Sequence, residues 1–268
     1  MNGEAQLNEN FSGVNSKWLR KSTTKIEIGE NVTIGPDAFE RYSSLLNITI
    51  PSSITSLGEY AFEGCRSLLS INIPSGVTRL EECVFDNCIS LSTVTVPKSI
   101  EYFGDEVFYE CYSLQSITLP DSLRVIGYSG FEGCCSLSNI IIPAYTRVIE
   151  ANAFQNCYLL PNIVIPEGLT DIKANAFKKC ESLSNITIPN NSHLLNIGAN
   201  AFNWCVSLSN ITIPSRVTRI PERAFEGCYE LLDVTIPDGV EYINTLAFSD
   251  CRSLSTVTFP DGLVSIGK

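Results

Sequence analysis

Cysteine and histidine are the residue types in this chain that could serve as nucleophiles, general bases or metal ligands. The 268 residues include eleven cysteines, but no Cys-x-x-Cys pair and no cysteine–histidine zinc pattern occurs. His193 is the only histidine, and it lies in no serine or cysteine nucleophile motif. Carboxylates are not clustered in a way that suggests general acid–base chemistry. The sequence therefore predicts a protein that is not an enzyme and that holds no metal or cofactor.

Nine of the cysteines occupy one position of an internal repeat, three residues after a recurring phenylalanine. They are Cys65, Cys88, Cys111, Cys134, Cys157, Cys180, Cys205, Cys228 and Cys251. Equivalent side chains on successive repeats point the same way, and parallel Cβ vectors do not converge as a disulfide requires. We expect these nine to be buried free thiols that act as small hydrophobic side chains. Cys83 and Cys135 lie outside this column, and we expect them to be exposed and reactive.

The repeat shows itself in several residue types at fixed distances. A phenylalanine recurs every 23 residues, with one step of 25, at Phe39, Phe62, Phe85, Phe108, Phe131, Phe154, Phe177, Phe202, Phe225 and Phe248. A leucine follows each phenylalanine after six residues and a proline after twelve. The unit reads A-F-x-x-C-x-S-L-x-x-I-x-I-P-x-x-V-x-x-I. Self-similarity at this period is typical of solenoids, in which stacked repeats bury a continuous core.

Two parts of the unit predict local structure. The I-x-I-P segment combines β-branched residues with period-two spacing, which favours a short strand whose isoleucines point inward and which the proline ends. The run that leads to A-F-x-x-C is too short for an independent helix, so we expect an extended segment followed by a single helical turn. Neighbouring repeats would pair their strands at about 4.7–4.9 Å. The phenylalanines would then stack into a spine inside the core.

The sequence L-x-x-I-x-I-P, followed by V-x-x-I and A-F-x-x-C-x-S, resembles the BspA-like class of leucine-rich repeats over about residues 25 to 268. The resemblance implies a curved leucine-rich-repeat solenoid, a right-handed superhelix. Its parallel β-sheet would line the concave face, and short helical turns or extended segments would form the convex side. Proteins of this class are largely surface-associated in microbes, and several are implicated in adhesion to host matrix and plasma proteins. The resemblance therefore implies a scaffold that binds a protein ligand at the cell surface or after secretion.

The uniform period predicts one continuous array and no linker. We assign residues 25–268 to the solenoid and residues 1–24, with Phe11 and Trp18 as their only aromatic residues, to an N-terminal flank or cap. Within the solenoid, residues 25–34 read as a worn half-repeat in which Gly29 replaces the proline.

Net charge and hydropathy limit the classes of partner that the chain could bind. The net charge of −11 excludes the basic stripe that phosphate contacts with nucleic acids need, and an anionic lipid surface would repel the chain. No secretory signal is visible and no apolar run is long enough to span a membrane. An intracellular protein-interaction module is the alternative to a surface protein, because free thiols persist best in a reducing compartment.

The candidate binding site lies in the columns that alternate outward on the strands, because side chains alternate across a sheet. Threonine and asparagine fill most of these positions, whereas Ile141 and Val164 interrupt them on two adjacent repeats, with Tyr145 just beyond. An apolar centre framed by hydroxyl and amide groups is typical of a protein interface, although drift of the repeat consensus would produce the same pattern. The predicted partner-binding residues are Thr95, Thr118, Asn139, Ile141, Tyr145, Asn162, Val164, Thr187 and Thr212.

A second surface is a weaker candidate. Tyr112, Tyr158 and Tyr229 each follow a column cysteine, and Trp204 precedes one. Tyrosine and tryptophan are enriched at contact surfaces, but scattered exposed aromatic residues are also normal. The two-residue insertion that carries His193 is interpreted as a tolerated surface loop.

Overall fold

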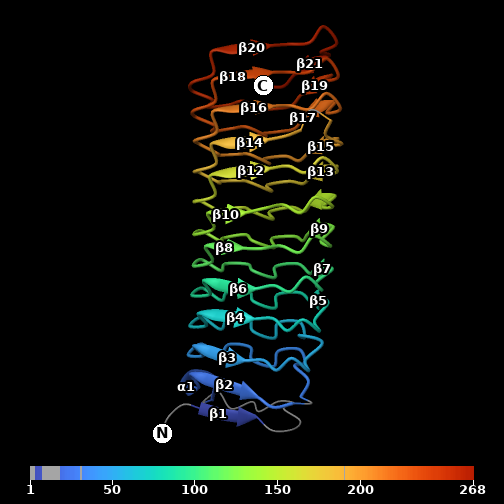
Figure 1. Cartoon of the computed structure of the whole chain (residues 1–268). Coiled ribbons are helices and arrows are strands. Elements are labelled where there is room, and N and C mark those ends of the chain that lie inside the picture. The colour runs from blue at the N-terminus through green and yellow to red at the C-terminus, as the bar shows by residue number, and fades with distance from the viewer. Residues whose placement is uncertain (1–3, 8–18, 31, 190) are drawn as a thin grey trace.

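A computed structural model describes residues 4–7, 19–30, 32–189 and 191–268 of the chain. The repeats form successive rungs of a parallel β-solenoid, stacked one above the next from the N-terminus to the C-terminus (Figure 1). Within the described residues the single helix is α1 (Leu19–Ser22), and no helix there has the length and hydropathy needed to span a bilayer. The predicted cap residues Phe11 and Trp18 lie outside the described residues. Each rung contributes to two strand ladders joined by turns.

From β2 onward the first ladder is built from the predicted I-x-I segments, and β1, which lies in the N-terminal flank, pairs with β2. Its strands are β1 (Glu4–Leu7), β2 (Lys25–Ile28), β3 (Asn47–Thr49), β4 (Ser70–Asn72), β6 (Thr93–Thr95), β8 (Ser116–Ile117), β10 (Asn139–Ile140), β12 (Asn162–Val164), β14 (Asn185–Thr187), β16 (Asn210–Thr212), β18 (Asp233–Thr235) and β20 (Thr256–Thr258). All recorded pairs are parallel and in register, so each residue lies opposite its equivalent one repeat away. Among the described strands, pairing is interrupted between β3 and β4, between β6 and β8, and between β10 and β12.

The second ladder comes from the V-x-x-I part of the repeat and lies along the opposite edge of the view in Figure 1. Its strands are β5 (Arg79–Leu80), β7 (Tyr102–Phe103), β9 (Val125–Ile126), β11 (Val148–Ile149), β13 (Asp171–Ile172), β15 (Asn196–Ile197), β17 (Arg219–Ile220), β19 (Tyr242–Ile243) and β21 (Ser265–Ile266). Isolated bridges from Ile34 to Leu57 and from Leu57 to Leu80 continue it toward the N-terminus. The half-repeat at residues 25–34 therefore joins both ladders, through β2 and Ile34, as its sequence predicts.

The segment around each phenylalanine forms overlapping β-turns in place of the single helical turn that the sequence predicted. Residues two before and two after the phenylalanine, such as Tyr60 and Gly64 around Phe62, have positive φ in every full repeat. Left-handed residues cannot continue a right-handed helical turn. The backbone N–H groups of Tyr60, Phe62 and Gly64 donate to carbonyl groups of the next rung at 3.0, 2.9 and 2.7 Å. The turns thus form a further hydrogen-bonded seam between rungs.

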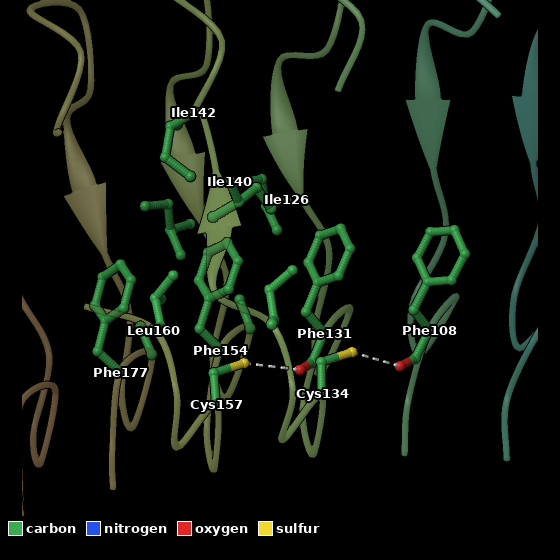
Figure 2. Packing of buried hydrophobic residues seen from close by; sticks show 14 of the residues in the cluster. Phe108, Ile126, Phe131, Cys134, Ile140, Ile142, Phe154, Cys157, Leu160 and Phe177 are labelled. Carbon is green, nitrogen blue, oxygen red and sulfur yellow. Dashed lines mark hydrogen bonds between the residues drawn. The ribbon is translucent and has the colours of Figure 1, made fainter. Parts of the chain in front are cut away.

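The ten phenylalanines form the predicted spine. Neighbouring rings stack with their centroids 5.3–5.6 Å apart and their planes within 20° of parallel. Offset stacking at this distance suits the aromatic quadrupole and adds to the free energy of burial. Figure 2 shows Phe108, Phe131, Phe154 and Phe177 on successive rungs, with Ile126, Ile140, Ile142 and Leu160 packed close to them. The core is therefore one continuous column.

The cysteine column is buried and free, as predicted, and it makes a contact that the sequence did not indicate. Each column thiol donates to the carbonyl oxygen of the phenylalanine one rung before it, as in Cys157 Sγ to Phe131 O at 3.2 Å (Figure 2). The same carbonyl accepts the backbone N–H of Cys134 at 3.1 Å. Eight of the nine column cysteines are buried, and Cys251 on the last rung is half-buried. Burial raises the pKa of the column thiols, which keeps them protonated as donors.

The two cysteines outside the column differ from expectation. The prediction that Cys83 is exposed was wrong: it is 3% exposed, and its thiol donates to Glu106 Oε2 at 3.5 Å. Cys83 stands at the left-handed position before Phe85, where the turn directs it toward the next rung. Burial, reinforced by the Glu106 charge, raises its pKa. Cys135 is half-buried, and burial raises its pKa as well, so neither thiol is an activated nucleophile.

Truncation of a spine residue should destabilise the whole stack. Phe154 is fully buried between two rings, so Phe154→Ala should lower the free energy of unfolding by about 3–5 kcal/mol. Phe248 is half-buried and stacks on one ring only, so Phe248→Ala is the matched control and should cost less. Equilibrium denaturation in urea measures both values. Equal costs for the two variants would contradict a spine whose energy comes from neighbours on both sides.

Thiol labelling of the folded chain should distinguish the half-buried cysteines from the buried ones by their reaction rates. Cys135 should react first with iodoacetamide, because it is the least buried cysteine away from the last rung. Its reaction rate should rise with pH, because its raised pKa leaves little thiolate near neutrality. The buried column thiols should react only after unfolding. Peptide mapping by mass spectrometry identifies the labelled sites. Early labelling of Cys157 or Cys83 would show that the turns open readily.

Candidate functional site

The outward side chains of the first ladder form a continuous polar face, which we call the first-ladder face. In β12 the burial alternates, with Asn162 and Val164 exposed and Ile163 buried between them. The same alternation appears in strands β4, β6, β14, β16 and β18. Thr118 and Thr187, whose burial would have contradicted the predicted strand orientation, are both exposed.

Strand register brings predicted site residues into rows along the solenoid. Asn162 lies opposite Asn185, and Val164 lies opposite Thr187. The remaining predicted residues occupy equivalent places: Thr95 pairs with Asn72, Asn139 with Ser116, and Thr212 with Thr235, while Thr118 follows the end of β8. Apart from the aliphatic Val164, these side chains carry uncharged hydroxyl and amide groups, which present donors and acceptors without a strong field.

Two large apolar side chains break this polar face, as the sequence predicted. Ile141 is 77% exposed and Val164 is 60% exposed, which are high values for side chains of this kind. They flank the interruption of the first ladder, because β10 pairs with β8 and β12 pairs with β14, with no recorded pairing between β10 and β12 in the described chain. Exposed apolar groups rimmed by polar residues mark interaction sites. The interruption itself has no signal in the repeat pattern.

Tyr145 lies outside the strands, on the turn that Pro143 begins and that the Thr146 N–H to Pro143 O bond closes at 3.0 Å. It is 56% exposed, and the guanidinium carbon of Arg124 lies 4.8 Å from its ring centroid. The structure therefore places Tyr145 at the border of the first-ladder face, with its ring already held by a neighbouring rung. Such a preordered aromatic side chain loses little entropy on binding.

The described residues contain no evident catalytic constellation. His193 is exposed, and its ring Nδ1 lies 3.1 Å from the carbonyl oxygen of Glu167. No three histidine, cysteine, aspartate or glutamate side chains in the described part of the chain gather closely enough to hold a metal ion. Ser192, beside the histidine, is buried and accepts the N–H of Leu194 at 3.1 Å, which shapes the inserted loop.

The turn surface, formed by the outward side chains around the column cysteines, carries a pocket that the sequence analysis missed. Its volume is about 300 Å³, and its lining includes Tyr109, Tyr112 and Tyr158 with Glu110 and Glu132. The sequence predicts that Tyr112 and Tyr158 lie at the surface, but no sequence signal joins them, because small residues lie between them in the hollow. Farther along the same surface, Trp204 and Tyr229 pack edge to face at 5.4 Å.

Solved structures of bacterial leucine-rich-repeat proteins share this architecture. A leucine-rich-repeat protein from Bacteroides ovatus is 26% identical, with 92% of this chain and 84% of that chain aligned at a TM-score of 0.57. A leucine-rich cell surface protein from Faecalibacterium prausnitzii is 23% identical over 95% of this chain and 87% of that chain, at a TM-score of 0.54. The pneumococcal vaccine antigen PcpA is 18% identical over 92% and 71%, at a TM-score of 0.56.

A search of curated proteins found no match. The family described as the BspA type leucine rich repeat region, with six copies, matches residues 32–161 and 147–268, which is most of the chain. These ranges include all ten phenylalanine rungs and the strands from β3 to β21. Together with the stacked fold, the match shows that the chain belongs to the family of BspA-type leucine-rich-repeat proteins.

Proposed function

We propose that this chain is a non-enzymatic scaffold that binds a protein ligand on the first-ladder face, between about Thr95 and Thr212. Leucine-rich-repeat proteins are generally protein-interaction scaffolds, and the family match extends that general role to this chain. The observation that carries the specific proposal is the pair Ile141 and Val164, exposed at the centre of a polar face.

The energetics favour this pair as the anchor of the contact. Binding energy concentrates in a few side chains that become fully desolvated, while the surrounding polar residues exclude water. Burial of each of these two branched aliphatic side chains would contribute about 1.5–3 kcal/mol to the free energy of binding. Thr118 and Thr187 on the flanking rungs supply hydroxyl groups for the rim, where hydrogen bonds fix orientation more than they add affinity.

The proposed setting is the cell surface or the extracellular space, in an adhesion role toward matrix or plasma proteins. The structural neighbour from Faecalibacterium prausnitzii is described as a cell surface protein, which supports this setting. An intracellular interaction module is the second candidate, and a specific observation favours it: all eleven cysteines are free thiols. The identity of the ligand distinguishes the two settings.

A double substitution tests the proposed face. Ile141→Glu with Val164→Glu should weaken binding about 100-fold or more, because charged groups would replace the apolar anchor. Both side chains are highly exposed, so the free energy of unfolding should change by no more than about 0.5 kcal/mol per site. Binding is measured by surface plasmon resonance against a panel of extracellular-matrix and plasma proteins, with cytosolic proteins as the comparison panel.

The matched control is Thr235→Glu with Thr258→Glu, which places the same charges in the same outward column near the last rungs. This control should bind with the affinity of the unmodified chain. Unchanged affinity in the Ile141 and Val164 variant would refute the site, and a ligand found only among the cytosolic proteins would favour the intracellular module.

A further inference from the structure

The residues that line the turn-surface pocket come from three successive rungs, those of Phe108, Phe131 and Phe154. Figure 2 shows the buried core residues of these three rungs. Tyr112 and Tyr158 occupy equivalent positions two rungs apart, each one residue after a column cysteine. Cys135 stands at the same position on the rung between them. Rungs of a parallel sheet are spaced about 4.7–4.9 Å apart, so the two tyrosine positions are separated by about 9–10 Å with only a small thiol side chain between.

A glycine deepens the same space. Gly133 lines the pocket and adopts a φ of +77°, a conformation that most other residues avoid. A Cβ atom built on Gly133 would lie 3.3 Å from the Cα atom of Glu110, which is tight contact with the rung below. The lining on the central rung thus includes the small residues Gly133 and Cys135, while the rungs on either side contribute Tyr112 and Tyr158.

The chain itself shows what fills this kind of space. Gly227 occupies the equivalent left-handed position four rungs beyond Gly133, on the rung that follows the longer repeat. The ring of Trp204 covers it, 3.1 Å from the place of a Cβ atom. Beside it, the guanidinium carbon of Arg252 lies 4.2 Å from the ring centroid of Tyr229. A tyrosine of the turn surface thus holds a cation that comes from the next rung.

The pocket at Gly133 holds neither an indole ring nor a guanidinium group, and the smaller Glu110 side chain covers the glycine, with its Cγ atom 3.4 Å from the place of a Cβ atom. Glu110 stands where Trp204 stands in the later rung, and Tyr158 stands where Arg252 stands. Elsewhere, Arg79 over Tyr102 at 4.0 Å and Arg219 over Tyr242 at 4.9 Å repeat the same one-rung stacking of a cation on a tyrosine. A cation one rung from Tyr112 and one rung from Tyr158 would lie about 5 Å from each, within the about 6 Å reach of a cation–π contact.

Negative charge is concentrated at this part of the solenoid. Between residues 81 and 123 the only basic residue is Lys98, against eight acidic residues: Glu81, Glu82, Asp86, Glu101, Asp105, Glu106, Glu110 and Asp121. Within the part of the chain that the structure describes, no lysine or arginine forms an ion pair with Glu110 or Glu132. Glu132 accepts bonds from Ser129 Oγ and Gln155 Nε2, both at 2.6 Å, which hold its carboxylate in place.

The titration of neighbouring groups reflects this potential. Burial, together with the charges of Glu110 and Glu132, raises the pKa of Tyr109. Burial and nearby carboxylates also raise the pKa of Asp86 to about 6. A site whose own anions disfavour further negative charge gains the most from a bound cation.

We propose that this pocket binds an alkylammonium group, as carried by a lysine side chain of a partner protein, held between Tyr112 and Tyr158 with Glu110 and Glu132 as counter-charges. Aromatic rings with nearby acidic groups recognise ammonium groups by cation–π attraction and charge. The volume of about 300 Å³ lies at the lower limit of ligand pockets, which suits the end of one side chain. This site is separate from the first-ladder face and does not depend on the function proposed for that face.

Protection of Cys135 measures occupancy, because its thiol lines the pocket. The folded chain is alkylated with iodoacetamide at mildly alkaline pH in the presence of a capped Gly-Lys-Gly peptide, and the rate at Cys135 is followed by mass spectrometry. The rate should fall about sixfold at a peptide concentration five times its dissociation constant. A capped peptide with norleucine in place of lysine has the same stem without the charge and should leave the rate unchanged.

A parallel experiment with tetramethylammonium distinguishes an unmodified lysine side chain from a methylated one as the occupant. Protection by the lysine peptide supports a lysine side chain as the occupant, and protection by tetramethylammonium alone supports a methylated form of the same group. The proposal is overturned if neither probe slows alkylation, or if the norleucine peptide protects as well as the lysine peptide does.

Variants with matched controls test the assigned residues. Glu110→Gln preserves shape while it removes one counter-charge, and Tyr158→Leu preserves bulk while it removes one aromatic face. Each should reduce the protection given by the lysine peptide at least about threefold. Glu226→Gln and Tyr229→Leu make the same changes on a later rung and should leave protection at Cys135 unaltered. Full protection retained in both pocket variants, with circular dichroism showing intact folding, would refute the site.

Discussion

Parallel pairing in register, one repeat against the next, is the constraint on which the rest of this structure depends. It places every side chain opposite its own equivalent at the spacing of a sheet. Phenylalanine therefore meets phenylalanine, and each column thiol meets the carbonyl group of the rung before it. Because a repeat touches little beyond its neighbours, stability accumulates rung by rung. Both ladders and the hydrogen-bonded seam of the turns hold successive repeats in this register.

The columns explain why much of the fold could be predicted. Ten phenylalanines at a nearly constant step allow few arrangements besides stacking, and an I-x-I-P segment can bury only one of its faces. The turn conformation was harder to predict. Glycine, asparagine or aspartate, which favour positive φ, occupy only some of the left-handed positions, and residues such as Ser129, Cys83 and Glu106 at others give no conformational signal. That conformation also determines the burial of Cys83. The equivalent residues in other repeats are exposed or half-buried, except Ser129, which is buried as Cys83 is.

The two candidate surfaces differ in how far sequence can reveal them. Ile141 and Val164 stand out because each interrupts a column of polar residues, so their exposure follows from strand alternation alone. The turn-surface pocket is defined by what its central rung lacks, at Gly133 and Cys135. A pattern of consensus residues does not report an empty space, and only the packed structure shows which small residues lie between large ones.

The longer repeat before Phe202 shows how the fold accommodates added length. The ring of Phe202 still stacks on that of Phe177 at 5.5 Å and 4°, and Cys205 still donates to Phe177 at 3.1 Å. The extra residues are accommodated in the loop that contains the buried Ser192 and Leu194, and the ring stacking and the thiol hydrogen bond beside it are unchanged. The length of one repeat can thus change without a change in the stacking distance between rungs. An insertion in a single repeat can therefore alter the outer surface at that rung while the neighbouring rungs keep their packing.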